Sequence, residues 1–353
     1  MSEAKGIVGW DVGGVQVKAA YFSPSGLPES GPDRVASEPF EIWRGPERLA
    51  EVLTTVFARV AGMPAERMAI TMTAELSDAF RTKREGVLHV LDAFATAFPG
   101  ADLAFLGLDG SFASPEAARA RPVSHAATNW VASARWLARE QPAGVMLDIG
   151  STTTDIIPFA DGRPLVRGET DVERLLSGEL VYTGVVRTNP NTMVRAVPLR
   201  GGWCRVAAEH FTCMGDVYVL LERLGQADYT SPTPDGRDVM SGAAARLSRL
   251  VCCDEETLSR EEVRALAGYV AEEQLGMILR ALNQVLSRAD LAGILEGGAA
   301  LVAAGAGAFL AEEIGRRSGR PVMTAAPNWP VQARRALPAS AVGALLRLEG
   351  AGR

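Results

Sequence analysis

The chain has 353 residues, of which 47% are hydrophobic and 22% are charged, and its formal net charge is −6. This composition is that of an ordinary globular protein and excludes long disordered tracts. The length favours two domains, because single domains usually have about 100–200 residues. The arginines are scattered among acidic residues, so the sequence predicts no continuous basic surface for a nucleic acid.

The sequence also bears on compartment. Its start lacks the apolar segment of a secretory signal. The four cysteines have the spacing neither of a disulfide framework nor of a CxxC pair: Cys204, Cys213, Cys252 and Cys253. Residues 291–311 are apolar over about the length of a membrane span, but Glu296 and paired glycines favour a turn, a strand and a helix start. We therefore expect a cytoplasmic protein with reduced thiols and no membrane segment.

The first part of the chain alternates strands and helices. Hydrophobic periodicity predicts strands at 6–10, 17–22, 69–73 and 103–106, and helices at 46–60 and 78–97. Residues 11–14 form a tight turn between the first two strands. This alternation is typical of an α/β lobe.

The second part begins with a helix at 128–140, after which strands are expected at 144–147 and 154–159. Residues 163–238 contain short strands and a proline-rich loop, and we interpret them as a substrate-specific insertion. Helices are predicted over 240–288, followed by a strand at 301–304 and a helix that ends near 317. A last helix at 340–348 is expected to pack on the second lobe.

An internal repeat is the most informative feature. Residues 11–18 align without gaps on residues 148–155. Each copy ends an apolar strand with an aspartate, turns on a glycine and returns as a strand that ends at Phe22 or Phe159. Two like hairpins predict two like lobes.

The turns of this repeat have the chemistry of a phosphate site. Glycine lets the backbone approach an anion, and the N–H groups of a tight turn form a concave nest for phosphate oxygens. The predicted donors are Gly13, Gly14, Gly150, Ser151, Thr152 and Thr153. Asp11 and Asp148 would repel a phosphate directly, so we expect them to hold Mg²⁺ between themselves and the ligand. A single such turn is usually only a hairpin, and it is the repetition that favours phosphate binding.

A third element follows the two hairpins. Residues 301–310 form a strand, a glycine turn at Gly305 and Gly307, and a helix start, where an anion or a flat ring can bind. Together the three segments resemble the phosphate 1, phosphate 2 and adenosine motifs of the actin, Hsp70 and sugar-kinase superfamily. The resemblance implies an α/β fold of two ribonuclease-H-like lobes, residues 1–127 and 128–353, with a central phosphate-binding cleft and the insertion at about 163–238.

Four further blocks resemble the hydantoinase/oxoprolinase-related family of tetrahydromethanopterin-linked C1 transfer pathway proteins. They are residues 71–76, 127–130, 178–188 and 214–218, and the third is the most specific. The resemblance covers nearly the whole chain. It implies a transferase that forms the aryl ether of the methanofuran or methylofuran core from γ-glutamyltyramine and an aminomethylfuran-methyl diphosphate, with release of pyrophosphate.

This chemistry suggests roles for individual side chains. Lys18 is a candidate donor to the leaving diphosphate. Glu75 is the preferred general base for the phenol, and His125 is an alternative that could equally be a structural residue at a helix start. Arg187 and Arg195 could hold the glutamyl carboxylates. Tyr182 is expected, with Arg187, to set the choice of acceptor.

Other functions fit the same hairpins. An ATP-dependent small-molecule kinase is less favoured, because no segment supplies the aspartate that activates the acceptor in such kinases. A hydantoinase or oxoprolinase amidohydrolase is another alternative, although those enzymes are generally much longer. A non-catalytic, actin-like nucleotide switch is a third. The expected partners are small molecules, without nucleic acid or membrane, and the sequence leaves a homodimer or a filament open.

Overall fold

The computed structural model describes residues 6–61, 67–229, 231–295 and 298–351. The chain divides by its contacts into two compact units. The first unit comprises Met1–Ala143, Phe159–Leu165 and Thr324–Arg353, and the second comprises Gly144–Pro158 and Val166–Met323. The first unit is therefore assembled from both ends of the chain, and the units do not coincide with the expected division after residue 127.

A six-stranded sheet forms the centre of the first unit. Its order is β3-β2-β1-β4-β5-β6, in which β1 is antiparallel to β2 and parallel to β4. The strands are β1 (Ile7–Val12), β2 (Gln16–Phe22), β3 (Arg34–Pro39), β4 (Arg67–Met72), β5 (Asp102–Leu106) and β6 (Phe112–Ala113). The first five strands have the order and directions of a ribonuclease-H-like sheet.

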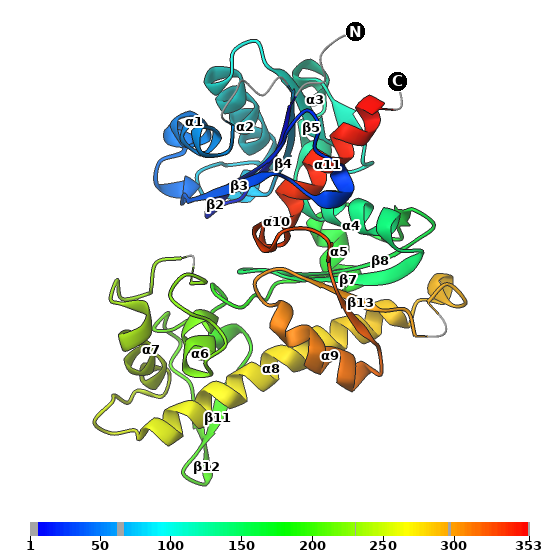
Figure 1. Cartoon of the computed structure of the whole chain (residues 1–353). Coiled ribbons are helices and arrows are strands. Elements are labelled where there is room, and N and C mark those ends of the chain that lie inside the picture. Colours follow the sequence, from blue (N-terminus) through cyan, green and yellow to red (C-terminus); the bar gives the residue numbers. More distant parts are fainter. Residues whose placement is uncertain (1–5, 62–66, 230, 296–297, 352–353) are drawn as a thin grey trace. The chain divides into compact units, whose positions relative to one another are not determined.

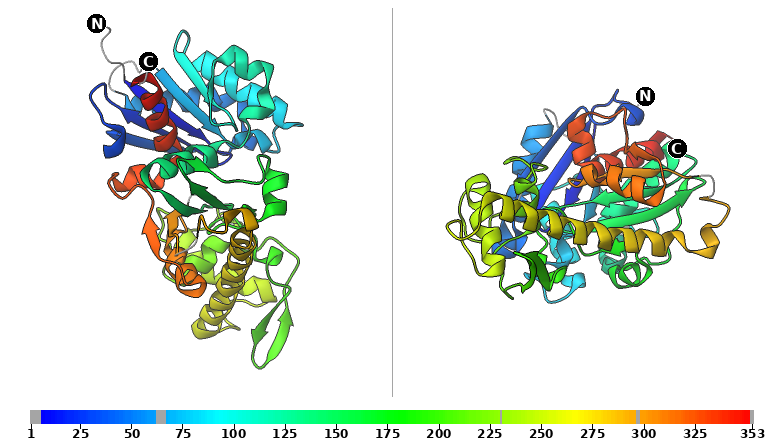
Figure 2. Two further views of the ribbon diagram at one scale, coloured as in Figure 1. Left: turned by 90° about the vertical axis from the view of Figure 1, so that its right-hand side faces the viewer. Right: turned by 90° about the horizontal axis from the view of Figure 1, so that it is seen from below.

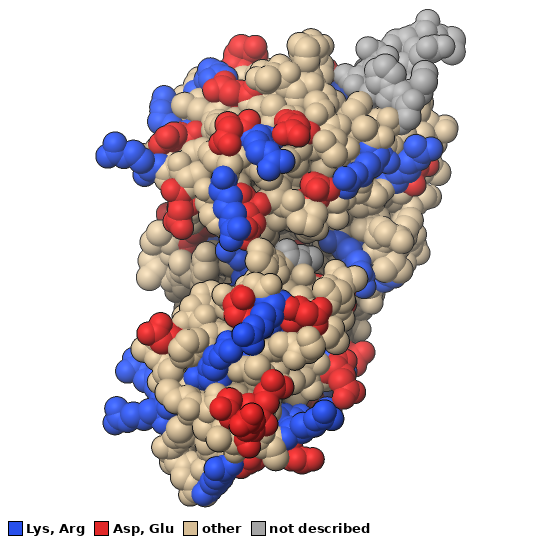
Figure 3. Space-filling model, turned by 90° about the vertical axis from the view of Figure 1, so that its left-hand side faces the viewer, with Lys and Arg blue, Asp and Glu red and all other residues tan. Residues whose placement is uncertain are grey.

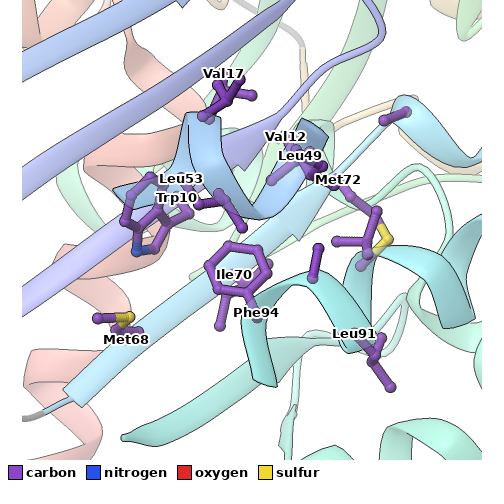
Figure 4. Close-up of a cluster of buried hydrophobic side chains, with 14 of the residues drawn as sticks. Trp10, Val12, Val17, Leu49, Leu53, Met68, Ile70, Met72, Leu91 and Phe94 are labelled. Carbon is purple, nitrogen blue, oxygen red and sulfur yellow. The ribbon is translucent and has the colours of Figure 1, made fainter. Parts of the chain in front are cut away.

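Helices cover both faces of this sheet (Figure 1). On one face lie α1 (Leu49–Val60) and α2 (Lys83–Ala97), and on the other α4 (Asn129–Glu140) and α11 (Leu337–Ala351). Because side chains alternate along a strand, Trp10 points into the core under α1 and α2, where its ring lies 5.5 Å from that of Phe94 (Figure 4). Gly9 faces α11, and a Cβ there would lie 2.0 Å from the carbonyl oxygen of Ala339.

The second unit contains a sheet of related topology. Its order is β10-β8-β7-β13-β14, in which β7 is parallel to β13. The strands are β7 (Ala143–Ile149), β8 (Thr154–Ala160), β10 (Leu180–Val181), β13 (Leu301–Ala304) and β14 (Val322–Thr324), while β9 (Arg163–Pro164) also pairs with β8. The hairpin β7–β8 thus takes the place that β1–β2 has in the first sheet, and β13 takes that of β4.

Helices and a small hairpin complete the two units. The long α8 (Arg260–Leu286) contacts α6, α7, α9 and the hairpin of β11 and β12, and Figure 2 shows its length. The remaining elements are α3 (Pro115–Ala120), α5 (Asp171–Ser177), α6 (Met214–Leu220), α7 (Val239–Ser248), α9 (Ala311–Ser318), α10 (Val331–Arg335), β11 (Ala196–Leu199) and β12 (Gly202–Arg205).

The expectation for the last helix was wrong. The helix α11 packs on β1, β2 and β4 and belongs with them to the first unit. Small residues explain this position, because Gly343 of α11 lies against the backbone of Gly9, where neither position has room for a side chain. The helix α4 contacts α11, and both belong to the first unit.

Among the described residues, no helix is both long and apolar enough to cross a bilayer. The apolar stretch at 291–311 contains β13 and reaches the start of α9, and Glu296 lies outside the described residues. Basic and acidic side chains are interspersed on the face in Figure 3. The four cysteines form no disulfide.

Candidate functional site

The first hairpin turns at residues 13–16. The turn is closed by a hydrogen bond of 3.0 Å from the N–H of Gly13 to the carbonyl of Gln16. Residues 40–42 donate two backbone N–H groups to the carbonyls of Gly14 and Val15, at 3.1 and 2.9 Å. The N–H groups of Gly14 and Val15 donate to no other described residue. The turn therefore has its carbonyls fixed by the protein and its amides available to a ligand.

Asp11 lies one residue before the end of β1 and is only 6% exposed. Its Oδ2 is 3.8 Å from Nζ of Lys18, and its Oδ1 has no hydrogen-bond partner in the part of the chain that the structure describes. Burial raises the pKa of Asp11 above its usual value, and the nearby Lys18 opposes this shift. A buried carboxylate with an unsatisfied oxygen fits a cation ligand, because a bound cation would offset the cost of its charge.

Two buried hydroxyls meet at the strand beside Asp11: Thr71 lies on β4, and Thr128 precedes α4. Thr71 is the parallel neighbour of Asp11 in the register of β1 and β4, so both side chains lie on one face of the sheet. Its Oγ1 is 2.8 Å from Oγ1 of Thr128, and both threonines are fully buried. Both belong to blocks that resemble the family, but the sequence did not indicate that they meet. The two threonines form a buried polar pair at the strand beside Asp11.

The two candidate bases occupy different surroundings in the first unit. Glu75 follows β4 in a short 3-10 helix, Ala74–Leu76, and is 1% exposed. A Cβ at Gly86 would lie 2.4 Å from the carbonyl oxygen of Glu75, so α2 packs directly on this turn. His125 is 5% exposed, and its Nδ1 is 3.0 Å from the carbonyl oxygen of Leu106 at the end of β5. This contact gives His125 a structural partner.

The second hairpin has the same construction. The N–H of Gly150 donates to the carbonyl of Thr153 at 2.8 Å. The N–H groups of residues 185–187 donate to the carbonyls of Gly150 and Ser151 at 2.8 to 3.1 Å. Within the described residues, the N–H groups of Ser151, Thr152 and Thr153 donate to no other backbone or side chain. In both copies of the repeat, the turn thus has free amides, while its carbonyls accept hydrogen bonds from a segment outside the hairpin.

Other predicted residues pack against this second turn. A Cβ at Gly184 would lie 2.4 Å from the backbone nitrogen of Thr152. Gly305 has a φ of +80°, and a Cβ there would lie 2.4 Å from Oδ1 of Asp148, so only glycine allows this approach. The N–H of Gly307 donates to the carbonyl of the last residue of β7 at 2.8 Å. The structure therefore brings the glycine segment at 305–307 beside Asp148.

The two copies differ in charge at one aligned position. Lys18 of the first hairpin is replaced by Asp155 in the second, which is buried and forms an ion pair with the buried Arg174. Burial raises the pKa of Asp155, and Arg174 opposes this shift. The second hairpin therefore has no positively charged side chain at this position. In the first hairpin the side chain of Lys18 is 25% exposed, so part of this side chain is accessible to a ligand.

The residues expected to bind the acceptor lie in or next to the chain segment that packs on the second turn. Tyr182 is 60% exposed and directly follows β10. The backbone of Arg187 contacts Ser151, and Arg195 is exposed eight positions further along the chain. Residues 184–187 are therefore part of the wall of the second hairpin, a role that the sequence did not predict for the insertion.

No group of three or more His, Cys, Asp or Glu side chains that could hold a metal ion occurs among the described residues. Mg²⁺ often binds to one or two carboxylates together with waters and substrate phosphates. The orphaned Oδ1 of Asp11 is the observation that fits such a ligand. Asp148, at the aligned position of the second hairpin, is the other candidate.

Two ribonuclease-H-like sheets, each with a phosphate-type hairpin, define a protein of the actin, Hsp70 and sugar-kinase fold class, as predicted. The chain belongs to the hydantoinase/oxoprolinase family, whose model matches residues 66–329. Solved structures at low similarity include ethanolamine utilization protein EutJ from Carboxydothermus hydrogenoformans, which is 15% identical with a TM-score of 0.47 and coverage of 96% of this chain and 89% of that chain. A ROK family glucokinase from Streptomyces griseus is 14% identical with a TM-score of 0.49, and the match covers 97% and 99% of the two chains.

Two relatives carry the same name, (4-{4-[2-(gamma-L-glutamylamino)ethyl]phenoxymethyl}furan-2-yl)methanamine synthase. The protein of Methanocaldococcus jannaschii is 30% identical over 288 residues, which cover 81% of this chain and 83% of that protein. The protein of Methanococcus vannielii is 31% identical over 152 residues, which cover 43% of this chain and 68% of that protein. The sequence resemblance to this family is thereby confirmed.

Proposed function

We propose that the chain is a transferase that joins γ-glutamyltyramine to an aminomethylfuran-methyl diphosphate, forming the aryl ether of a methanofuran-type core and releasing pyrophosphate. The observation that carries the proposal is the pair of turns whose amides are free and whose carbonyls are fixed. Such turns bind phosphate oxygens. The name shared by the two relatives supports this particular substrate pair.

The proposed reaction needs one displacement. The phenol oxygen forms a bond to the furan-methyl carbon while the bond from that carbon to the diphosphate oxygen breaks. The electron pair of the breaking bond leaves with pyrophosphate, and the phenol proton passes to a base. The furan ring can share positive charge at the reacting carbon, so the phenol, a modest nucleophile, suffices once it is held in line.

The residues of the two hairpins divide this work. The free amides at residues 14–15 and 151–153 bind diphosphate oxygens, and Lys18 adds a positive charge beside the first turn. Asp11 and Asp148 would hold Mg²⁺, which would neutralise the negative charge that grows on the leaving group. Glu75 is our candidate for the base, because it is a buried carboxylate three residues after the end of β4.

The direct test is an assay with purified protein, Mg²⁺, γ-glutamyltyramine and the furan-methyl diphosphate. We expect the ether and pyrophosphate to form in equal amounts without ATP, with the ether followed by mass spectrometry and the pyrophosphate by a coupled assay. If the protein makes no ether but consumes ATP in the presence of a small alcohol or a cyclic amide, the synthase proposal fails in favour of a kinase or an amidohydrolase.

A second prediction concerns acceptor choice. Tyr182→Ala is expected to raise the KM for γ-glutamyltyramine by about fivefold, since an aromatic contact to a ligand contributes on the order of 1 kcal/mol. Its KM for the diphosphate should change little. Trp203→Ala is the matched control, because Trp203 is also an exposed aromatic, at 69%, but lies on β12. Equal effects of Tyr182→Ala on both KM values would contradict a role in acceptor choice.

A further inference from the structure

Gln274 lies in the middle of α8 and is fully buried. Its Nε2 donates to Oγ1 of Thr183 at 2.7 Å and to the carbonyl of Gly184 at 2.8 Å. Its Oε1 accepts from the hydroxyl of Tyr218 at 2.6 Å. Both ends of the amide are therefore engaged, in a place without access to solvent. A buried glutamine with three short hydrogen bonds fixes the groups that it contacts.

The groups that Gln274 holds lead directly to the second hairpin. The carbonyl of Thr183 accepts from the side chain of Thr154, the first residue of β8, at 2.8 Å. Gly184 lies against the backbone of residues 151–152, and the three residues that follow it donate to the carbonyls of the turn. Thr183 and Gly184 are therefore the two residues that connect Gln274 of α8 with the backbone of the second turn, where the free amides lie.

A second anchor reaches the same segment from α6. The N–H of Gly215 donates to the carbonyl of Val186 at 2.9 Å, and the N–H of Met214 donates to that of Thr188 at 2.9 Å. Tyr218, which holds Gln274, lies one turn further along α6. Residues 183–188 are therefore hydrogen-bonded to both α6 and α8. The hydrogen bond between Gln274 and Tyr218 links the two helices next to this segment.

We infer that Gln274 is a positioning residue of the diphosphate site. It fixes Thr183 and Gly184, which lead directly into residues 185–187, and the N–H groups of these three residues hold the carbonyls of the turn at 150–151. The neighbouring amides thereby keep the spacing that an anion requires. The inference rests on the proposed function for the identity of the ligand. The geometry that carries it lies wholly within the second unit.

The test compares three variants by calorimetric titration with Mg²⁺ and inorganic pyrophosphate, and separately with Mg²⁺ and ATP. Gln274→Leu removes the three hydrogen bonds and is expected to weaken pyrophosphate binding at least tenfold. Tyr218→Phe removes one hydrogen bond, keeps the packing of the ring, and should weaken binding by a smaller factor. Gln284→Leu is the matched control, because Gln284 also lies on α8 and its Nε2 donates to a backbone carbonyl, that of Leu176 in α5, at 2.9 Å.

The outcomes separate the inference from the proposed function. Pyrophosphate binding that is lost in Gln274→Leu and kept in Gln284→Leu, at similar unfolding temperatures, supports both. Unchanged pyrophosphate binding in both Gln274→Leu and Tyr218→Phe overturns the inference. Losses of binding that are equal in all three variants and that parallel their drops in unfolding temperature also overturn it. If the wild type binds ATP and not pyrophosphate, the proposed function fails. The same comparison of variants made with ATP then decides whether Gln274 positions the anion-binding turn. Binding of neither ligand by the wild type overturns both. If Gln274→Leu does not fold, Tyr218→Phe decides alone.

Discussion

Asp148→Asn is expected to lower turnover in the proposed reaction by about two orders of magnitude or more, while the fold stays intact. Asp148 ends the apolar part of β7, is partly exposed, and lies against Gly305 beside the second turn. Asparagine keeps the size of the side chain but removes the charge that would hold Mg²⁺. Steady-state rates over a series of Mg²⁺ concentrations, with circular dichroism melting of the same samples, make the measurement.

The control for this variant is Asp78→Asn. Asp78 is an exposed aspartate outside both hairpins, so the same loss of one charge should leave turnover within about twofold. Near-normal turnover of Asp148→Asn would remove the metal assignment for this residue. A loss of the melting transition would instead show that the carboxylate serves the fold.

Asp11→Asn is expected to change activity and stability in opposite directions. Turnover should fall as it does for Asp148→Asn, because the repeat gives both aspartates the same place in their hairpins. Without Mg²⁺, however, the variant should unfold at a higher temperature than the wild type at neutral pH. The cause is the buried carboxylate, whose Oδ1 lacks a partner among the described residues and whose ionisation is costly in the folded state.

The pH dependence gives the sign of this effect. Burial raises the pKa of Asp11 in the folded protein above its value in the unfolded chain. The wild type therefore has the full contribution of the protonated group below the unfolded pKa and loses it as the pH rises through the folded pKa. Asparagine does not titrate, so the stability advantage of Asp11→Asn should grow from about pH 4 towards neutrality. Melting curves in chelator at several pH values measure it, and a variant less stable than the wild type at every pH would show that the pair with Lys18 dominates.

The parts of the fold that depend on neighbours in sequence were predictable. The strand at 301–304 has the predicted bounds, and the two hairpins are found where the repeat placed them. Each of these features shows in a short pattern, since an apolar strand that ends in aspartate and glycine needs no distant partner to be visible. The helix α2 begins at Lys83 and not at the expected residue 78, because residues 77–82 form turns and bends and Thr82 caps the start of the helix.

The parts that depend on distant partners were not predictable. Gln274 is one polar residue in a helical pattern, and nothing near it indicates that it meets Thr183. The block at 178–188 was recognised as the most specific part of the sequence, but its contact with the turn at 150–151 appears only in three dimensions. In the same way, the glycines of β1 and α11 are far apart in sequence, and their match is not visible in either segment alone.

The packing of α11 on β1 has a consequence for the order in which the chain can fold during synthesis. The second unit ends at Met323, so its sequence is complete before the last helix leaves the ribosome. The strand that carries Asp11 is made before the second unit, but one face of it stays uncovered until residues 337–351 arrive. We therefore expect the amino-terminal sheet to mature last, and a chain truncated before Leu337 to expose an apolar sheet face and to bind chaperones or aggregate.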